Sequence, residues 1–177
     1  MKKFKVRIEG MRPLLQHRFD DSDTAAKSTK RAGPRDFSEE WKKGLYQMEN
    51  GTIYQPAEHI EKSIERAATN FQIRGRGQKT YKELCTSSVC IEPIFIPHKK
   101  QKFEIDRRSV RVQKSRIMRE RPRFDEWALD FEIVVTEDQL PGPVLKEILD
   151  HAGRHIGIGD YRPKFGLFYV TEWKEIK

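Results

Sequence analysis

The sequence has no long apolar run and only two cysteines. No hydrophobic segment approaches the length of a membrane span, and the N-terminus, MKKFKVRIEG, lacks the apolar core of a signal peptide. Cys85 and Cys90 are too few to indicate a disulfide framework. These absences predict a soluble, cytoplasmic protein.

Hydrophobic residues are also scarce. They make up 36% of the 177 residues, whereas charged residues make up 35%. The apolar residues still recur with clear periodicity, which predicts one folded domain over residues 1–177 rather than global disorder. Residues 20–35, DDSDTAAKSTKRAGPR, are polar with Ala, Gly and Pro, and we expect a flexible surface insertion there.

Positive charge is in excess, and one segment holds it. The formal net charge is +8, and residues 99–123 contain eleven Lys or Arg against three acids, so this segment accounts for the whole excess. Local alternation of apolar residues within it predicts a long, projecting basic β-ribbon. Such a concentration of charge suits a polyanion-binding face. The alternative is a solvated charged hairpin without a partner.

The order of periodic segments predicts an α+β fold. Reduced to its core, the order is strand, helix, strands, helix, strand, which approximates the ferredoxin-like arrangement of RNA-recognition-motif domains. We expect an antiparallel sheet with two helices on one face and the other face open. A short extra strand, Thr52–Tyr54, precedes the first helix. The main predicted elements are strand 4–8, helix 56–71, strands within 88–98, strand 126–135, helix 141–157 and strand 167–170.

A glycine-rich loop separates the second predicted helix from the last strand. Residues His155–Val170 read HIGIGDYRPKFGLFYV. Glycine permits positive φ and close backbone approach, and successive exposed N–H groups can form an anion-binding nest. We therefore expect Gly157 and Gly159, with Arg162 and Lys164 beside them, to contact phosphates. The alternative is that these glycines only cap the helix and turn the chain.

Two stretches resemble a known family. GIGDYRPKFGLFYV is similar to the C-terminal glycine-rich loop and strand of the RAMP superfamily of CRISPR proteins, with the stronger match at Gly157, Gly159 and Gly166. IYQPAEHIEKSIERAA resembles the proline-led turn and first conserved helix of its backbone subunits, through Pro56 and Ile60. The resemblance implies a single-stranded-RNA-binding domain, often present in many copies along the strand, with a β-hairpin thumb that the basic ribbon would match.

The chain also departs from that family. It is short for a CRISPR backbone subunit, and Ala57-Glu58-His59 stands where the family often has Gly-Ser-Ser-like residues. These departures favour a stand-alone relative, for example one encoded by a phage or prophage.

We therefore predict a non-enzymatic protein that binds single-stranded nucleic acid without a cofactor or metal. RNA is favoured over DNA by the resemblance only. An electrostatic groove would track the backbone, and Tyr161 or Phe165 would stack on bases. Contact with about five phosphates predicts a salt slope near −3.5 in log affinity. The predicted contacts are Arg107, Arg108, Arg111, Lys114, Arg116, Gly157, Gly159, Arg162 and Lys164, with Arg74 and Arg76 as outer contacts.

Two alternative functions remain open. The first is a metal-independent RNA endonuclease on the same fold, in which His17 moves a proton and Arg18 stabilises the phosphorane. The sequence marks no second catalytic group beside His17. The second is a protein-interaction module of a phage or defence assembly, whose basic ribbon docks an acidic protein.

Metal sites are a further alternative. Cys85 and Cys90 combined with His151 and His155 could form a zinc tetrahedron, although some sixty residues separate the two pairs and buried structural cysteines are commoner. Asp106 or Asp160 could hold a divalent ion on a phosphate, but each has arginine neighbours with which it can pair.

Overall fold

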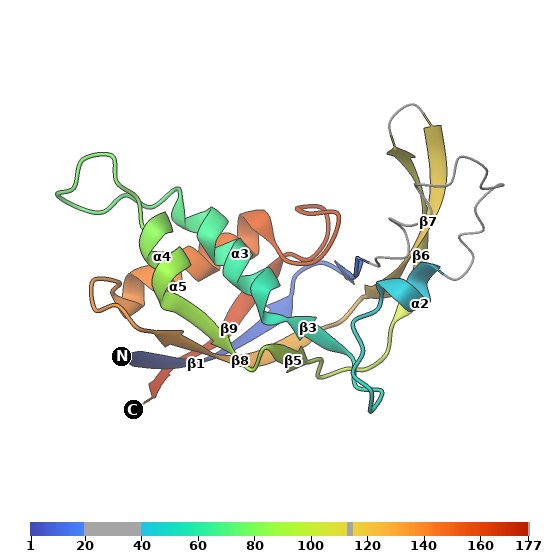
Figure 1. Ribbon diagram of the computed structural model, residues 1–177, viewed down its shortest axis with the longest axis horizontal. Helices are drawn as coiled ribbons and strands as arrows, with labels where there is room; N and C mark the ends of the chain where they lie inside the picture. The colour runs from blue at the N-terminus through green and yellow to red at the C-terminus, as the bar shows by residue number, and fades with distance from the viewer. Residues whose placement is uncertain (20–39, 113–114, 177) are drawn as a thin grey trace.

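A computed structural model describes residues 1–19, 40–112 and 115–176 (Figure 1). The predicted insertion at 20–35 and the predicted contact Lys114 lie outside the described residues. Within the described part of the chain, no helix is both long and apolar enough to cross a membrane.

A four-stranded antiparallel sheet forms the centre of the molecule. Its strands are β1 (Lys2–Gly10), β4 (Val89–Glu92), β8 (Ala128–Val135) and β9 (Phe168–Ile176), in the order β4-β8-β1-β9. Helix α3 (Ala57–Ala68) follows β1, helix α5 (Gly142–His151) follows β8, and both cover the same face (Figure 1). This is the ferredoxin-like order, so the predicted fold class is confirmed.

The core lies between this sheet and its helices because apolar residues alternate along the strands. Phe4, Val6 and Ile8 of β1 are buried, and Ile60 and Ile64 of α3 meet them from the helical layer. Such alternation places every second side chain on the covered face of a sheet. The predicted apolar faces are therefore the ones that form the core.

The opposite face of the sheet neutralises its own charge. Lys3 Nζ lies 3.8 Å from a carboxylate oxygen of Glu92, and Arg7 Nε lies 3.5 Å from one of Asp130. Lys99 Nζ lies 2.5 Å from the second oxygen of Asp130. Cations and anions alternate across this open face, so it does not present the positive surface that a polyanion needs.

The basic ribbon forms as predicted and projects from the body (Figure 1). It consists of β6 (Glu104–Val112) and β7 (Ser115–Phe124), and β7 also pairs with the short β2 (Leu14–Leu15). Helix α2 (Glu40–Gly44) lies against β7.

Several elements differ from the sequence-based expectation. The extra strand is β3 (Tyr54–Pro56), which pairs with β5 (Phe95–Pro97). An unpredicted helix, α4 (Lys82–Ser88), precedes β4, and α5 continues as a π-helical turn, η1 (Ala152–Ile156). The bounds of β3 and of α5 differ because the first and last residues of an element depend on tertiary contacts that local periodicity does not report.

Candidate nucleic-acid interface

The base of the ribbon contacts the glycine-rich loop, which we define as residues 157–166. Arg121 Nε on β7 lies 2.8 Å from Asp160 Oδ2 in the loop. The guanidinium carbon of Arg108 on β6 lies 4.5 Å from the ring centroid of Phe165. Two regions more than thirty residues apart in sequence therefore form one surface, as the predicted binding site requires.

The glycines of this loop serve the protein's own packing, which is the alternative that the sequence leaves open beside an anion nest. The N–H of Gly157 donates to Ala152 O at 2.8 Å, and the N–H of Ile158 donates to Gly166 O at 2.9 Å. Asp160 N–H donates to Leu15 O at 2.9 Å. These donors are already occupied by carbonyls of the chain and do not face a ligand.

Steric contacts also indicate that these glycines pack against the protein's own backbone. A Cβ at Gly157 would lie 2.7 Å from Gly166 O, and one at Gly159 would lie 2.5 Å from Leu15 O. Gly157 has φ +75° and ends the π-helical turn. Gly157 and Gly159 therefore cap a helix and let backbone segments approach each other, and they hold the rest of the loop in place.

Most ribbon arginines are paired within the protein. Arg108 Nε lies 2.5 Å from Asp106 Oδ1, although Arg108 was a predicted phosphate contact. Arg107, another predicted contact, lies 2.7 Å from Glu120 Oε1. The remaining pairs in the described ribbon are Arg119 with Glu40, Arg121 with Asp160, and Arg123 with Glu104, Asp106 and Asp125. The charge that the sequence concentrates here is thus largely balanced at the base of the ribbon.

Arg111 and Arg116 differ from these paired arginines. They are exposed, they are direct cross-strand partners, and no acid of the described chain pairs with either of them. Like charges directly opposite on two strands repel. We name Arg111 and Arg116 the ribbon-tip pair, and a bound anion is what would relieve their repulsion.

The loop carries a second group of cations. Arg162 and Lys164 have no acid partner among the described residues. Burial, followed by the neighbouring charge of Arg66, lowers the pKa of Arg162. Burial is the larger cause, and the charge of Arg66 adds to it whereas that of Asp160 opposes it.

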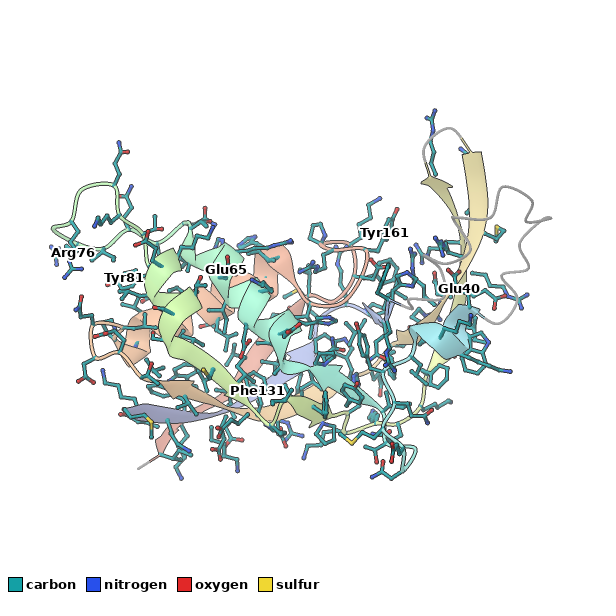
Figure 2. All side chains as sticks on the ribbon, viewed as in Figure 1. Glu40, Glu65, Arg76, Tyr81, Phe131 and Tyr161 are labelled. Carbon is teal, nitrogen blue, oxygen red and sulfur yellow. The ribbon has the colours of Figure 1, made fainter. Side chains whose placement is uncertain are left out.

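An exposed aromatic side chain stands at the loop surface. Tyr161 is 42% exposed and has φ +55°, a backbone conformation that non-glycine residues rarely adopt. Lys164 Nζ lies 5.8 Å from its ring centroid (Figure 2 labels Tyr161). Phe165, the other predicted platform, is only 8% exposed and is covered by Arg108, so its role is packing.

A polar group that includes His59 and Tyr46 lies beside the loop. Burial, followed by the charge of Arg162, lowers the pKa of His59, so its imidazole is neutral at pH 7. Tyr46 packs edge-on to His59 with ring centroids 5.5 Å apart. The sequence indicates His59 as a histidine near the start of α3, whereas nothing in the sequence points to Tyr46.

The structure leaves the catalytic hypothesis as a prediction and argues against the zinc site. His17 follows β2 and is half-buried, and its proposed catalytic role stays a prediction. Cys85 is buried, which raises the pKa of its thiol to about 12, whereas Cys90 is exposed. Among the described residues, no three His, Cys, Asp or Glu side chains come together to hold a metal ion, so Cys85, Cys90, His151 and His155 do not form the zinc tetrahedron.

The predicted outer contacts, Arg74 and Arg76, lie elsewhere. They belong to an exposed loop between α3 and α4 at the end of the helical layer opposite the ribbon (Figures 1 and 2). The structure therefore does not bring them to the ribbon–loop junction.

Comparison with known proteins gives a structural match. No protein-family model matches the sequence, and no curated protein is significantly similar to it. One chain of the "Cryo-EM structure of the Type III-B Cmr-beta bound to cognate target RNA" shares the fold, with a TM-score of 0.63 and 13% sequence identity. The match covers 99% of this chain and 61% of that one, so this chain spans about three fifths of its neighbour's length. At this identity the likeness shows the fold alone.

Proposed function

We propose that the protein binds single-stranded nucleic acid across the ribbon-tip pair and the loop 157–166, with RNA as the preferred strand. The observation that carries this proposal is the ribbon-tip pair. Arg111 and Arg116 face each other on adjacent strands, whereas the arginines nearer the base of the ribbon have carboxylate partners. An arrangement that is unfavourable in the free protein becomes favourable when a phosphate lies between the two guanidinium groups.

Binding would combine two elements. The ribbon-tip pair, Arg162 and Lys164 would hold the phosphate backbone, and the ring of Tyr161 would stack on a base. This combination of positive charge and an aromatic surface is typical of proteins that bind single strands without sequence readout. The contact between Arg121 and Asp160 would fix the two elements relative to each other.

The preference for RNA has two supports. The loop and the first helix resemble those of the RAMP superfamily, and the structural neighbour belongs to a complex described as bound to target RNA. On this basis the chain is a RAMP-like protein that acts alone or in several copies along one strand. Its short length and the sequence at 57–59 favour a stand-alone relative, of the kind a phage or prophage encodes.

The test is fluorescence anisotropy with matched fluorescent strands of about 16 nucleotides, a length within the range of known single-strand sites. RNA, DNA of the same sequence and the blunt RNA duplex are titrated at two salt concentrations. The proposal predicts the tightest binding to single-stranded RNA, weaker binding at higher salt, and weak binding to the duplex. Equal affinity for the strand and the duplex would contradict it.

An RNA endonuclease is the second candidate, and the neutral imidazole of His59 beside Arg162 favours it. A neutral imidazole can accept a proton, and a nearby cation can stabilise the phosphorane. Labelled hairpin RNA is incubated with the wild type, His17→Ala and His59→Ala, with and without a chelator. Chelator-resistant cleavage that one of these variants abolishes would establish the enzyme, and intact RNA in every reaction would leave binding as the function.

A further inference from the structure

A second group of exposed cations lies in the loop between α3 and α4, which we call the outer loop (residues 72–80). Arg74, Arg76 and Lys79 are exposed, and no acid of the described chain pairs with any of them. Arg76 donates a hydrogen bond of 3.0 Å to the side-chain oxygen of Gln139. In contrast with the base of the ribbon, the positive charge here is not balanced by the protein.

The outer loop has a defined backbone but little packing. Gln72 and Thr80 form a β-bridge, and the N–H of Ile73 donates to Lys79 O at 2.8 Å. Gly75 and Gly77 have φ +80° and +62°, yet a Cβ on either would have no atom within 4 Å. Unlike the glycines of the loop 157–166, these two allow tight turns in an open loop, which holds its cations away from the body.

Helix α3 lies between the two basic regions, the loop 157–166 and the outer loop. Arg66 is exposed on this helix, and Ser63, one turn earlier, donates a hydrogen bond of 2.9 Å from its Oγ to Gly157 O, so α3 lies against the loop 157–166. Helix α3 ends at Ala68, four residues before the outer loop begins at Gln72. Its 12 residues span about 18 Å at 1.5 Å each.

Two of the three acids along α3 are engaged by the protein, whereas Glu58 is exposed in the first turn of the helix. Glu65 lies 2.8 Å from Lys62 Nζ and 3.8 Å from Lys82 Nζ (Figure 2 labels Glu65). Glu61 accepts a hydrogen bond of 3.0 Å from the N–H of Ile91. The carboxylate of Glu65, on the half of α3 nearer the outer loop, is therefore balanced by its two lysines.

From these observations we propose that the bound strand continues from the loop 157–166 along α3, and that the outer loop holds its distal phosphates. This inference rests on the proposed function and adds a second contact region, so that the full site is longer than the ribbon–loop junction. Figure 1 shows the outer loop and the ribbon rising on the same side of the sheet, at opposite ends of the helical layer.

The test measures whether removing charge from the outer loop weakens the binding of a long strand but not of a short one. Binding of single-stranded RNA of about 6 and about 16 nucleotides is measured for the wild type and for Arg74→Ala/Lys79→Ala. The matched control is Lys5→Ala/Lys174→Ala, which removes two exposed, cross-strand cations from the opposite face of the sheet. Thermal unfolding of each variant confirms that the fold is intact.

We expect the outer-loop variant to bind the longer strand about 10-fold more weakly, with a salt slope smaller by about 1.4, and to bind the shorter strand like the wild type. Arg74→Glu/Lys79→Glu should enlarge the loss. Unchanged binding of both strands by these variants would overturn the inference while leaving the ribbon–loop site in place. Failure of the wild type to bind either strand would instead remove the proposed function.

Discussion

Arg121 and Asp160 join the ribbon to the loop 157–166. Their side chains are 2.8 Å apart, and Arg121 is only 9% exposed. The Asp160 side chain is 34% exposed, and salt screens such a partly buried ion pair less than one on the surface. The projecting ribbon is thereby held in a fixed position beside the loop that carries Arg162 and Tyr161.

The first prediction concerns this ion pair. In a double-mutant cycle with Arg121→Ala and Asp160→Ala, the coupling free energy of unfolding should be about 1 kcal/mol, because the Arg121 side chain is 11% exposed and that of Asp160 is 34% exposed, so water screens the pair only in part. The exposed pair Lys62 and Glu65 is the control and should give about 0.3 kcal/mol. Urea unfolding measures both. Equal coupling for the two pairs would show that Arg121 and Asp160 do not hold the ribbon to the loop.

The second prediction separates the binding role of Tyr161 from its structural role. Tyr161→Ala should weaken single-strand binding about 10-fold, because base–aromatic stacking is worth about 1–3 kcal/mol, and Tyr161→Phe should retain it. Tyr161→Gly should lose binding equally, yet unfold no more easily, because glycine accepts φ +55° without strain.

The control for Tyr161 is Tyr169→Ala. Tyr169 is 52% exposed on β9, outside the proposed site. Anisotropy titrations give the affinities, and urea unfolding gives the stabilities. If Tyr161→Ala and Tyr169→Ala have the same affinity, then Tyr161 does not act as a base platform.

The third prediction tests why the loop contains glycine. Gly166→Ala should destabilise the fold by more than about 3 kcal/mol, because its Cβ would lie 1.8 Å from Ile158 O at φ +73°. Gly77→Ala, at φ +62° with no atom within 4 Å of its Cβ, should cost only about 1 kcal/mol. Comparable losses of unfolding free energy in the two variants would contradict the packing role assigned to Gly166.

The fourth prediction concerns pH. Burial lowers the pKa of His98 to about 4, and its Nε2 lies 3.3 Å from the side-chain amide of Gln16. Between about pH 6.5 and pH 4 the unfolded chain therefore binds more protons than the folded one at this residue. The unfolding free energy should fall by about 3 kcal/mol as the pH decreases through this range.

Two variants isolate this effect. His98→Phe, which keeps a ring against Phe124, should remove most of the pH dependence in that range. His155→Gln, at an exposed position, should leave it unchanged. A pH dependence that persists in His98→Phe would assign it to other groups. Urea unfolding at a series of pH values provides the measurement.

The fold was largely predictable because its central strands and helices are strongly periodic. Alternation at Phe4, Val6 and Ile8 and the helical stripe at Ile60 and Ile64 each indicate which face is buried. Helix α4 was missed because KELCTSS is short and mostly polar and has no apolar stripe. The ribbon was predicted from its alternation and charge, and its pairing confirms it.

The site was only partly predictable because charge pairing depends on distant residues. Glu40 and Asp160, which pair with Arg119 and Arg121, are remote from the ribbon in sequence, so counting charges overestimates the free positive charge. The glycines near Gly157 looked like a ligand-binding turn because sequence does not show which atoms approach them. Tertiary contacts, rather than local pattern, decide both points.

The most direct measurement is the salt dependence of single-stranded RNA binding by Arg111→Ala/Arg116→Ala. Among the residues that the structure describes, four cations without an acid partner remain at the ribbon tip and loop, namely Arg111, Arg116, Arg162 and Lys164, so the expected wild-type slope for a strand limited to them is about −2.8 rather than −3.5. The variant should bind more weakly with a slope near −1.4, and Lys5→Ala/Lys174→Ala should match the wild type. A slope that is flat in the wild type, or equally reduced in both variants, would contradict the account.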